Sequence, residues 1–159
     1  MPLSMSQASV PHFIRGLGQL ETILKLGEAA DPGLAAARLA PDMLPLSGQV
    51  QRASDTAKGC IARLSGVENP RFADDEKTFA DLYARIGSTL DFIKSVPTEM
   101  IDGSETRHVE VKGGGKVFEF TGLHYLQRHA LPNFYFHVSI AYAILRHNGV
   151  ALSKRHYLG

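Results

Sequence analysis

The sequence predicts an all-α protein, an up-down bundle of four helices with a short β-hairpin before the last helix. Three observations predict this fold class. Apolar residues recur at steps of three and four along four long segments, short connections with glycine or proline separate these segments, and the period shortens towards two at only one place. Long amphipathic helices bury their apolar stripes by packing side by side, which favours a bundle.

The first two helices are expected from about Ser4 to Ala29 and from about Pro41 to Ser65. Pro11 predicts a late start or a kink in the first helix, and Gly66 ends the second. The apolar stripe of the first helix comprises Val10, Phe13, Leu17, Leu20 and Leu24. The stripe of the second comprises Met43, Leu46, Val50, Ala53, Ala57, Cys60 and Leu64, the near-heptad spacing of bundle helices.

The second half of the chain predicts two more helices and a hairpin between them. Asp74 and Asp75 are expected to cap the third helix, because negative charge is favourable at a helix start. The fourth is expected from Thr121 or Gly122 to about His147, with a kink at Pro132. The stripe of the third helix comprises Phe79, Leu82, Ile86, Leu90 and Ile93. The hairpin strands contain Val109, Val111, Val117, Phe118 and Phe120 around Gly113–Gly115.

Composition indicates one globular domain that spans residues 1–159. The chain is 44% hydrophobic and 21% charged, and its 17 basic and 16 acidic residues leave a formal charge of +1. No basic cluster with interleaved aromatics points to nucleic acid, and no apolar run is long enough to span a membrane. The absence of a signal-peptide pattern and the single cysteine, Cys60, predict a cytoplasmic protein.

A ladder of polar residues on the fourth helix is the strongest sign of a functional site. His129, Asn133 and His137 follow one another at steps of four, and each step drifts by only about 40° around a helix. The three side chains therefore share one side of a helix that is otherwise apolar. Polar groups on a core face need partners, which are a hydrogen-bond network, a metal ion or a ligand.

Several sequence blocks resemble one protein family. These are Met5–Pro11, Ala40–Leu46 with Gln49–Gln51, Leu131–His137, Leu145–Val150 and Tyr157–Gly159. With the helix order and the polar ladder, they resemble the DinB-like (YfiT-like) superfamily of four-helix bundles, and more closely a bacterial domain-of-unknown-function branch of it. The resemblance covers nearly the whole chain.

The resemblance implies a metal site that this sequence does not fully supply. Active members of the superfamily hold a metal ion with one histidine from helix two and a His-x3-His pair from helix four. His137 matches the second member of that pair, but Asn133 stands at the first, and Gln49 is the nearest polar residue on helix two. Amides are poor transition-metal ligands beside imidazole, so the set favours no cofactor over Zn²⁺ or Ni²⁺. His137 is the candidate metal ligand.

Three functions remain open at this point. The first is a degenerate DinB-like site that binds a small molecule at the bundle core, with Gln49, Asn133, His137 and Tyr142 as candidate ligand-binding residues and no assigned catalytic residue. The second is a non-catalytic, self-associating bundle in which these residues form a buried polar network. The third is a metal-dependent transferase or hydrolase whose site His12, His129 or a carboxylate completes. The superfamily resemblance also implies a homodimer.

Overall fold

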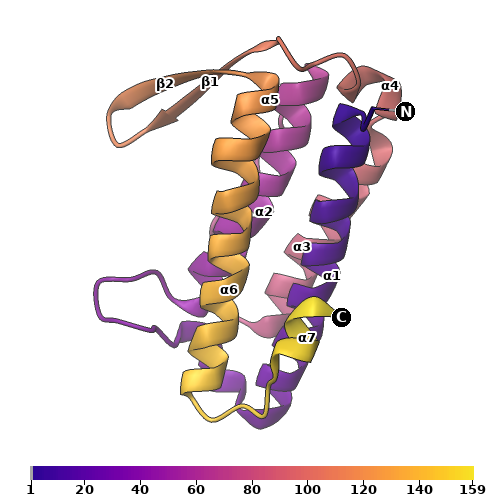
Figure 1. Cartoon of the computed structure of the whole chain (residues 1–159). Helices are drawn as coiled ribbons and strands as arrows, with labels where there is room; N and C mark the ends of the chain where they lie inside the picture. The colour runs from indigo at the N-terminus through magenta and orange to yellow at the C-terminus, as the bar shows by residue number, and fades with distance from the viewer. Residues whose placement is uncertain (1) are drawn as a thin grey trace.

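The computed structural model describes residues 2–159 and confirms a helical bundle with a hairpin before its last helix (Figure 1). Its four long helices are α1 (Met5–Ala30), α2 (Leu46–Ser65), α3 (Phe79–Ser95) and α6 (Leu131–His147). The shorter elements are η1 (Pro32–Ala36), α4 (Thr98–Ile101), β1 (His108–Gly113), β2 (Lys116–Thr121), α5 (Gly122–Tyr125), the π-helical turn η2 (Leu126–Ala130) and α7 (Lys154–Leu158).

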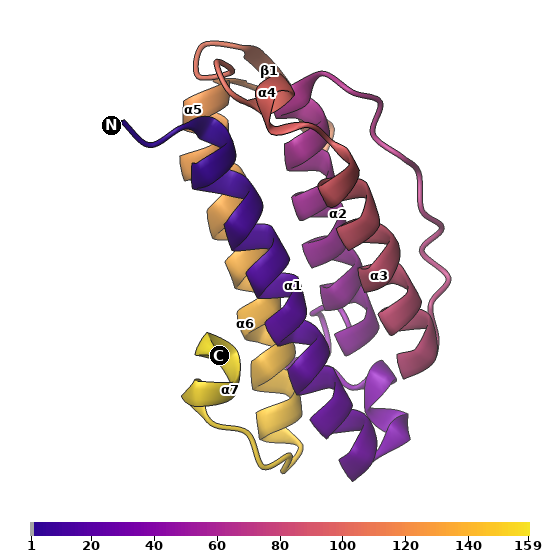
Figure 2. The same ribbon diagram turned by 90° about the vertical axis from the view of Figure 1, so that its right-hand side faces the viewer.

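The order of helix directions differs from a simple alternation, because α2 and α3 run the same way (Figure 2). Residues 66–78 form a long connection that runs back along the bundle between the end of α2 and the start of α3. Side-chain contacts agree with this order. Tyr83 near the start of α3 donates to Glu28 near the end of α1, and Asp102 just after α4 accepts from the Ser6 amide at the start of α1. The expectation of short connections throughout is therefore wrong at this connection.

The helices α2 and α3 begin later in the chain than the sequence predicted, because other residues occupy their N-cap positions. The helix α3 begins after Thr78, whose hydroxyl accepts from the Asp81 amide while the Asp81 carboxylate accepts from the Thr78 amide. Asp74 and Asp75 therefore do not cap it. The helix α2 begins at Leu46, five residues later than expected, with Pro45 at its N-cap.

Two prolines were expected to disturb their helices. The helix α1 continues through Pro11 without interruption and starts at a capping box formed by Ser4. Pro132 lies in the first turn of α6, directly after the π-helical turn of residues 126–130. A proline lacks the amide that would bond to the preceding turn, and the wider turn removes the need for that bond. The expected kink at Pro132 is thus a π-helical turn just before it.

The core lies between the four long helices and is continuous from one end of the bundle to the other. Two glycines of α1 allow α6 to approach closely: a Cβ at Gly16 would lie 2.4 Å from the Phe134 ring, and one at Gly27 would lie 2.7 Å from Leu145. The Phe134 ring packs edge-on against Phe13 within this contact. Within residues 2–159, no helix has both the length and the apolar character that crossing a membrane requires.

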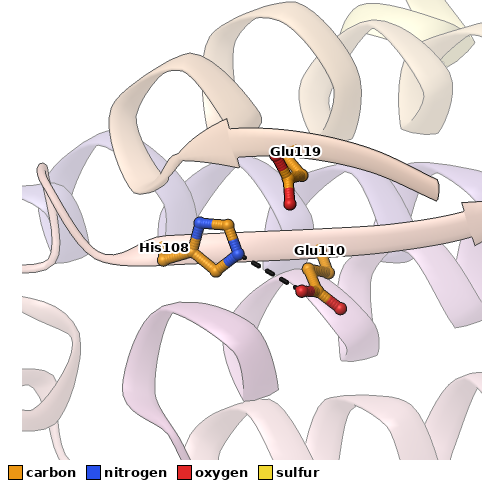
Figure 3. Close-up of side chains that lie close together, drawn as sticks. All are labelled: His108, Glu110 and Glu119. Atoms are coloured by element: carbon orange, nitrogen blue, oxygen red, sulfur yellow. Dashed lines mark hydrogen bonds and ion pairs between the residues drawn. The ribbon is translucent and has the colours of Figure 1, made fainter.

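The hairpin projects from one end of the bundle and has two different faces. Gly114 and Gly115, both at positive φ, form its two-residue turn. Strand side chains alternate between faces, and Val109 is buried on the inner one. The outer face carries His108 and Glu110 on β1, with Glu119 directly opposite Glu110 on β2 (Figure 3).

We expect Gly16→Ala to lower the free energy of unfolding by about 1–3 kcal/mol, because the new methyl group overpacks the contact with Phe134. Gly18→Ala is the matched control, since a Cβ there meets nothing within 4 Å. That variant should be neutral or more stable by up to about 1 kcal/mol, because alanine is the better helix former. Urea unfolding followed by circular dichroism measures both, and equal effects would contradict the close packing of α1 on α6.

Candidate functional site

The centre of the candidate site is a hydrogen bond between α6 and α2. The His137 Nδ1 atom lies 2.8 Å from the Gln49 Oε1 atom. Gln49 is 2% exposed and sits in the first turn of α2, where its Nε2 donates to the Leu44 carbonyl at 3.2 Å. Two of the residues predicted from sequence are therefore in direct contact, across the interface of α2 and α6.

This bond determines the protonation state of His137. Because the Gln49 Nε2 atom donates to a backbone carbonyl, its Oε1 atom must face the imidazole, and an amide oxygen can only accept. The proton of the neutral ring is therefore on Nδ1, and Nε2 carries a lone pair. Among the described residues the Nε2 atom makes no hydrogen bond, and it is not sealed from solvent.

The surroundings of His137 disfavour its charged form. Burial lowers the pKa of His137 to about 4, and the positive charge of Arg52 on α2 acts in the same direction. The Arg52 guanidinium is itself half-exposed and lies 3.4 Å from an Asp55 carboxylate oxygen and 3.7 Å from one of Asp74. At neutral pH the imidazole is an uncharged hydrogen-bond acceptor.

Asn133 lies one turn before His137 and also contacts α2, though through a different residue. Its Nδ2 atom donates to the Thr56 hydroxyl at 2.9 Å, and that hydroxyl donates to the Arg52 carbonyl at 2.7 Å. Gln49 and Thr56 are seven residues apart on α2, so they lie on one face of that helix. The structure thus brings Asn133, His137 and Gln49 together where α2 and α6 pack. We call these three residues and Thr56 the polar seam.

His129, the third member of the predicted ladder, has another environment. Its ring stacks on Tyr125 at 5.7 Å between centroids and packs against Phe120 of the hairpin. Burial lowers the pKa of His129, and the charge of Arg63 lowers it further. The stack holds His129 beneath the hairpin and away from His137.

Tyr142 and His12 lie on the opposite side of α6 from the polar seam. Tyr142 packs edge-on against Tyr157 of α7, beside a hollow of about 270 Å³. The His12 Nδ1 atom lies 3.0 Å from the Tyr135 hydroxyl, at a larger pocket of about 400 Å³ between α1, α6 and α7. The structure therefore does not bring Tyr142 or His12 together with His137.

The polar seam does not fit the metal site that the family resemblance implies. It offers one imidazole nitrogen, while the Gln49 oxygen is occupied by the His137 N–H group and the Asn133 amide donates to Thr56. Zn²⁺ sites of proteins use several histidine, cysteine or carboxylate ligands. Within residues 2–159, one group of three histidine, cysteine or carboxylate side chains has its ligand atoms within 4.8 Å of one another. It consists of His108, Glu110 and Glu119 on the hairpin.

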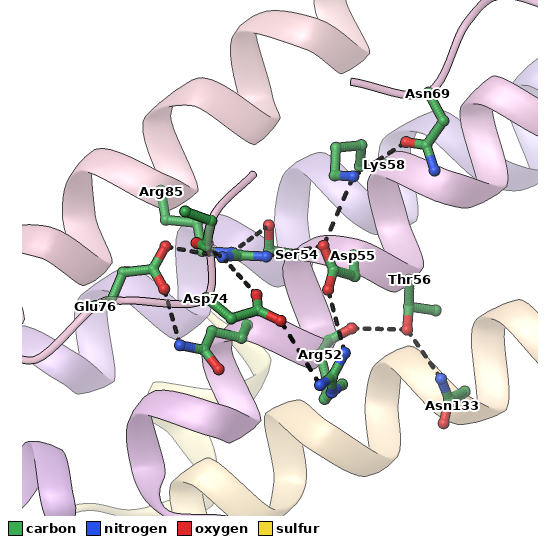
Figure 4. A network of polar contacts seen from close by, with 12 residues as sticks. Arg52, Ser54, Asp55, Thr56, Lys58, Asn69, Asp74, Glu76, Arg85 and Asn133 are labelled. Carbon is green, nitrogen blue, oxygen red and sulfur yellow. Dashed lines mark hydrogen bonds and ion pairs between the residues drawn. The ribbon is translucent and has the colours of Figure 1, made fainter. Parts of the chain in front are cut away.

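A buried ionic cluster between α2, α3 and the 66–78 connection was not predicted from sequence (Figure 4). Arg85 of α3 has a side chain that is 1% exposed and lies 2.8 Å from carboxylate oxygens of both Asp55 and Glu76. Its Nη1 atom also lies 3.0 Å from Asp74 and donates to the Ala73 carbonyl. Together these bonds hold the connection against the two helices.

Lys58 of α2 is a second buried cation in the same cluster. Its ammonium group donates to Asn69 at 3.0 Å and to the Pro70 carbonyl at 2.6 Å, and burial lowers its pKa. The Phe72 ring lies 4.9 Å from the ammonium and 5.7 Å from the Arg85 guanidinium. The cluster is satisfied internally, which indicates a structural role.

Comparison with known proteins agrees with the fold. Residues 5–158 match the family described as a domain of unknown function, DUF1993. The fold is similar to the crystal structure of a DinB family member protein from Shewanella denitrificans, with 36% identity, a TM-score of 0.85, and coverage of 96% of this chain and 90% of that one. No curated protein sequence matches the chain. Since the family match spans nearly every residue, the chain belongs to the DUF1993 family and has a DinB-like fold.

Proposed function

We propose that this protein binds a small polar molecule at the polar seam, through hydrogen bonds and without a metal ion. The observation that supports this proposal is the state of His137. Its Nδ1–H group is used by Gln49, while its Nε2 lone pair has no partner among the described residues and reaches solvent. A half-buried acceptor held in one orientation is the kind of polar group that fixes a ligand.

The surroundings of the His137 ring indicate the chemistry of such a ligand. Nε2 would accept a hydrogen bond from an O–H or N–H group. The Phe136 ring, 51% exposed, packs edge-on beside His137 and offers an apolar wall. The Arg52 guanidinium, only loosely paired with its two carboxylates, adds attraction for an anionic group. We infer a small hydroxy or amino compound with an apolar part and a negative charge.

Binding is favoured over acid–base catalysis by the basicity of His137. A general base is most effective when its pKa lies near the operating pH. With a pKa of about 4, the His137 imidazole is a weak base at neutral pH. The same residue works as a hydrogen-bond acceptor at any pH above that value.

The alternative is a bundle without a ligand, in which the polar seam only fixes helix register. The bonds from His137 to Gln49 and from Asn133 to Thr56 favour it, because each joins α6 to α2. Homodimer formation and a cytoplasmic location remain predictions under both functions. Sedimentation velocity at micromolar concentration tests the first of them.

The ligand proposal is tested with mixtures of small hydroxy and amino acids, screened by NMR against protein carrying ¹⁵N-labelled histidine at pH 7. A bound compound should shift the His137 Nε2 resonance, because a new hydrogen bond changes its shielding. His137→Gln should weaken binding at least tenfold, since about 1.4 kcal/mol corresponds to that factor. His147→Gln, at the exposed end of α6, is the matched control and should bind normally. Failure of every compound to move Nε2, or equal binding to His137→Gln, would contradict the proposal.

A second prediction concerns stability below neutral pH. The folded-state pKa of His137 is about 4 against an ordinary value of 6.5, so below pH 6.5 the unfolded chain takes up a proton that the folded chain does not. The stabilising contribution is complete above pH 6.5 and is lost between pH 6.5 and 4, at no more than about 1.4 kcal/mol per pH unit.

Wild type should therefore lose stability over this range faster than His137→Gln, which has no titrating group at the seam. Urea unfolding at half-unit pH steps measures both proteins. Parallel curves between pH 6.5 and 4 would show that His137 titrates normally in the folded state.

A further inference from the structure

We infer that the outer face of the hairpin is a binding site for a divalent transition-metal ion, with His108, Glu110 and Glu119 as its ligands. This site is separate from the polar seam and does not depend on the function proposed for it. The three side chains come from two strands whose pairing fixes their positions (Figure 3).

The register of the hairpin gathers the three ligand atoms. His108 and Glu110 are two residues apart on β1 and so point to the same face, and Glu119 is the direct partner of Glu110 on β2. One nitrogen or carboxylate oxygen from each residue lies within 4.8 Å of the others, and the His108 Nε2 atom is 3.4 Å from a Glu110 oxygen. Ligands bound at about 2.0–2.2 Å from one ion lie within this separation of each other.

The charges on this face are unbalanced without a cation. Like charges directly opposite each other on neighbouring strands destabilise the pair. Glu110 and Glu119 are placed in this way, and in residues 2–159 neither carboxylate forms an ion pair with a lysine or arginine. A bound divalent cation would replace this repulsion with two attractive contacts.

The neighbouring surface leaves room for further ligands of the ion. His108 and Glu119 line a hollow of about 480 Å³ that His124 of α5 and Arg128 also border. Three protein ligands leave coordination positions for water or for a bound molecule, as in catalytic rather than structural metal sites. His124 is an additional donor that lines the hollow, and Arg128 supplies a positive charge there.

The donor set indicates which ions would bind. One imidazole and two carboxylates suit Zn²⁺, Ni²⁺, Co²⁺ or Mn²⁺, whereas Ca²⁺ and Mg²⁺ prefer oxygen ligands alone. For one site, affinity should rise from Mn²⁺ through Co²⁺ to Ni²⁺. All three ligands are exposed, so binding needs no rearrangement of the core and their substitution should not unfold the protein.

Isothermal titration of the full-length protein with Zn²⁺ and, separately, Ni²⁺ tests the site. We expect about one ion per chain, with affinity reduced at least tenfold, or about 1.4 kcal/mol, in each of Glu119→Gln, Glu110→Gln and His108→Asn. Circular dichroism should show that all three variants remain folded. His147→Asn, an exposed histidine outside the hairpin, is the matched control and should bind as the wild type does.

Three outcomes of these titrations would overturn the inference. Absence of binding at millimolar Zn²⁺ and Ni²⁺ would contradict it, as would unchanged affinity in the hairpin variants. Loss of the ion in His137→Gln, with the hairpin variants unaffected, would place the metal at the polar seam. That result would overturn both this inference and the metal-free function, whereas failure at the hairpin alone leaves the seam proposal standing.

Discussion

The contact between Gln49 and His137 is the constraint on which the site depends. Gln49 is almost fully buried, so both ends of its amide need partners, and an unpaired buried polar group costs about 1–3 kcal/mol. One end bonds to the Leu44 carbonyl and the other to the imidazole of α6. This arrangement joins two helices at a defined register and sets the tautomer of His137 by geometry.

The same contact differs from the metal site that the resemblance to the DinB-like superfamily implies. A histidine from helix two would direct a ring nitrogen at a metal ion, whereas Gln49 directs an oxygen that is already accepting a hydrogen bond. Asn133 likewise engages Thr56. Both amides thus bond across from one helix to the other. The three side chains that we propose as metal ligands lie instead on the exposed face of the hairpin.

Much of the fold was predictable because apolar spacing is a local signal. The stripes of the four long helices and the glycine turn of the hairpin each follow from residues close in sequence. The sequence also named Gln49 and His137 as candidate ligand-binding residues, and the two side chains are in contact. The position of Tyr142 on the fourth helix could not show which segment packs against its side chain. In the structure that segment is α7, through Tyr157.

The ionic cluster was missed because its burial depends on contacts far apart in sequence. Lys58 and Arg85 each lie beside an apolar stripe, where a long cationic side chain normally extends to solvent. The connection of residues 66–78 covers them, and its path along the bundle follows from the parallel order of α2 and α3 rather than from any local pattern. The charge of these residues alone does not indicate that a distant segment of the chain buries them.

The sharpest test of the contact between Gln49 and His137 is the protonation state of His137, read from long-range ¹H–¹⁵N correlations of the imidazole at pH 7. We expect a neutral ring with its proton on Nδ1 and an unprotonated Nε2, because the Gln49 oxygen can only accept. A ring protonated on Nε2, or a charged imidazolium at this pH, would contradict it. Either result would mean that Gln49 does not hold His137 as an open acceptor.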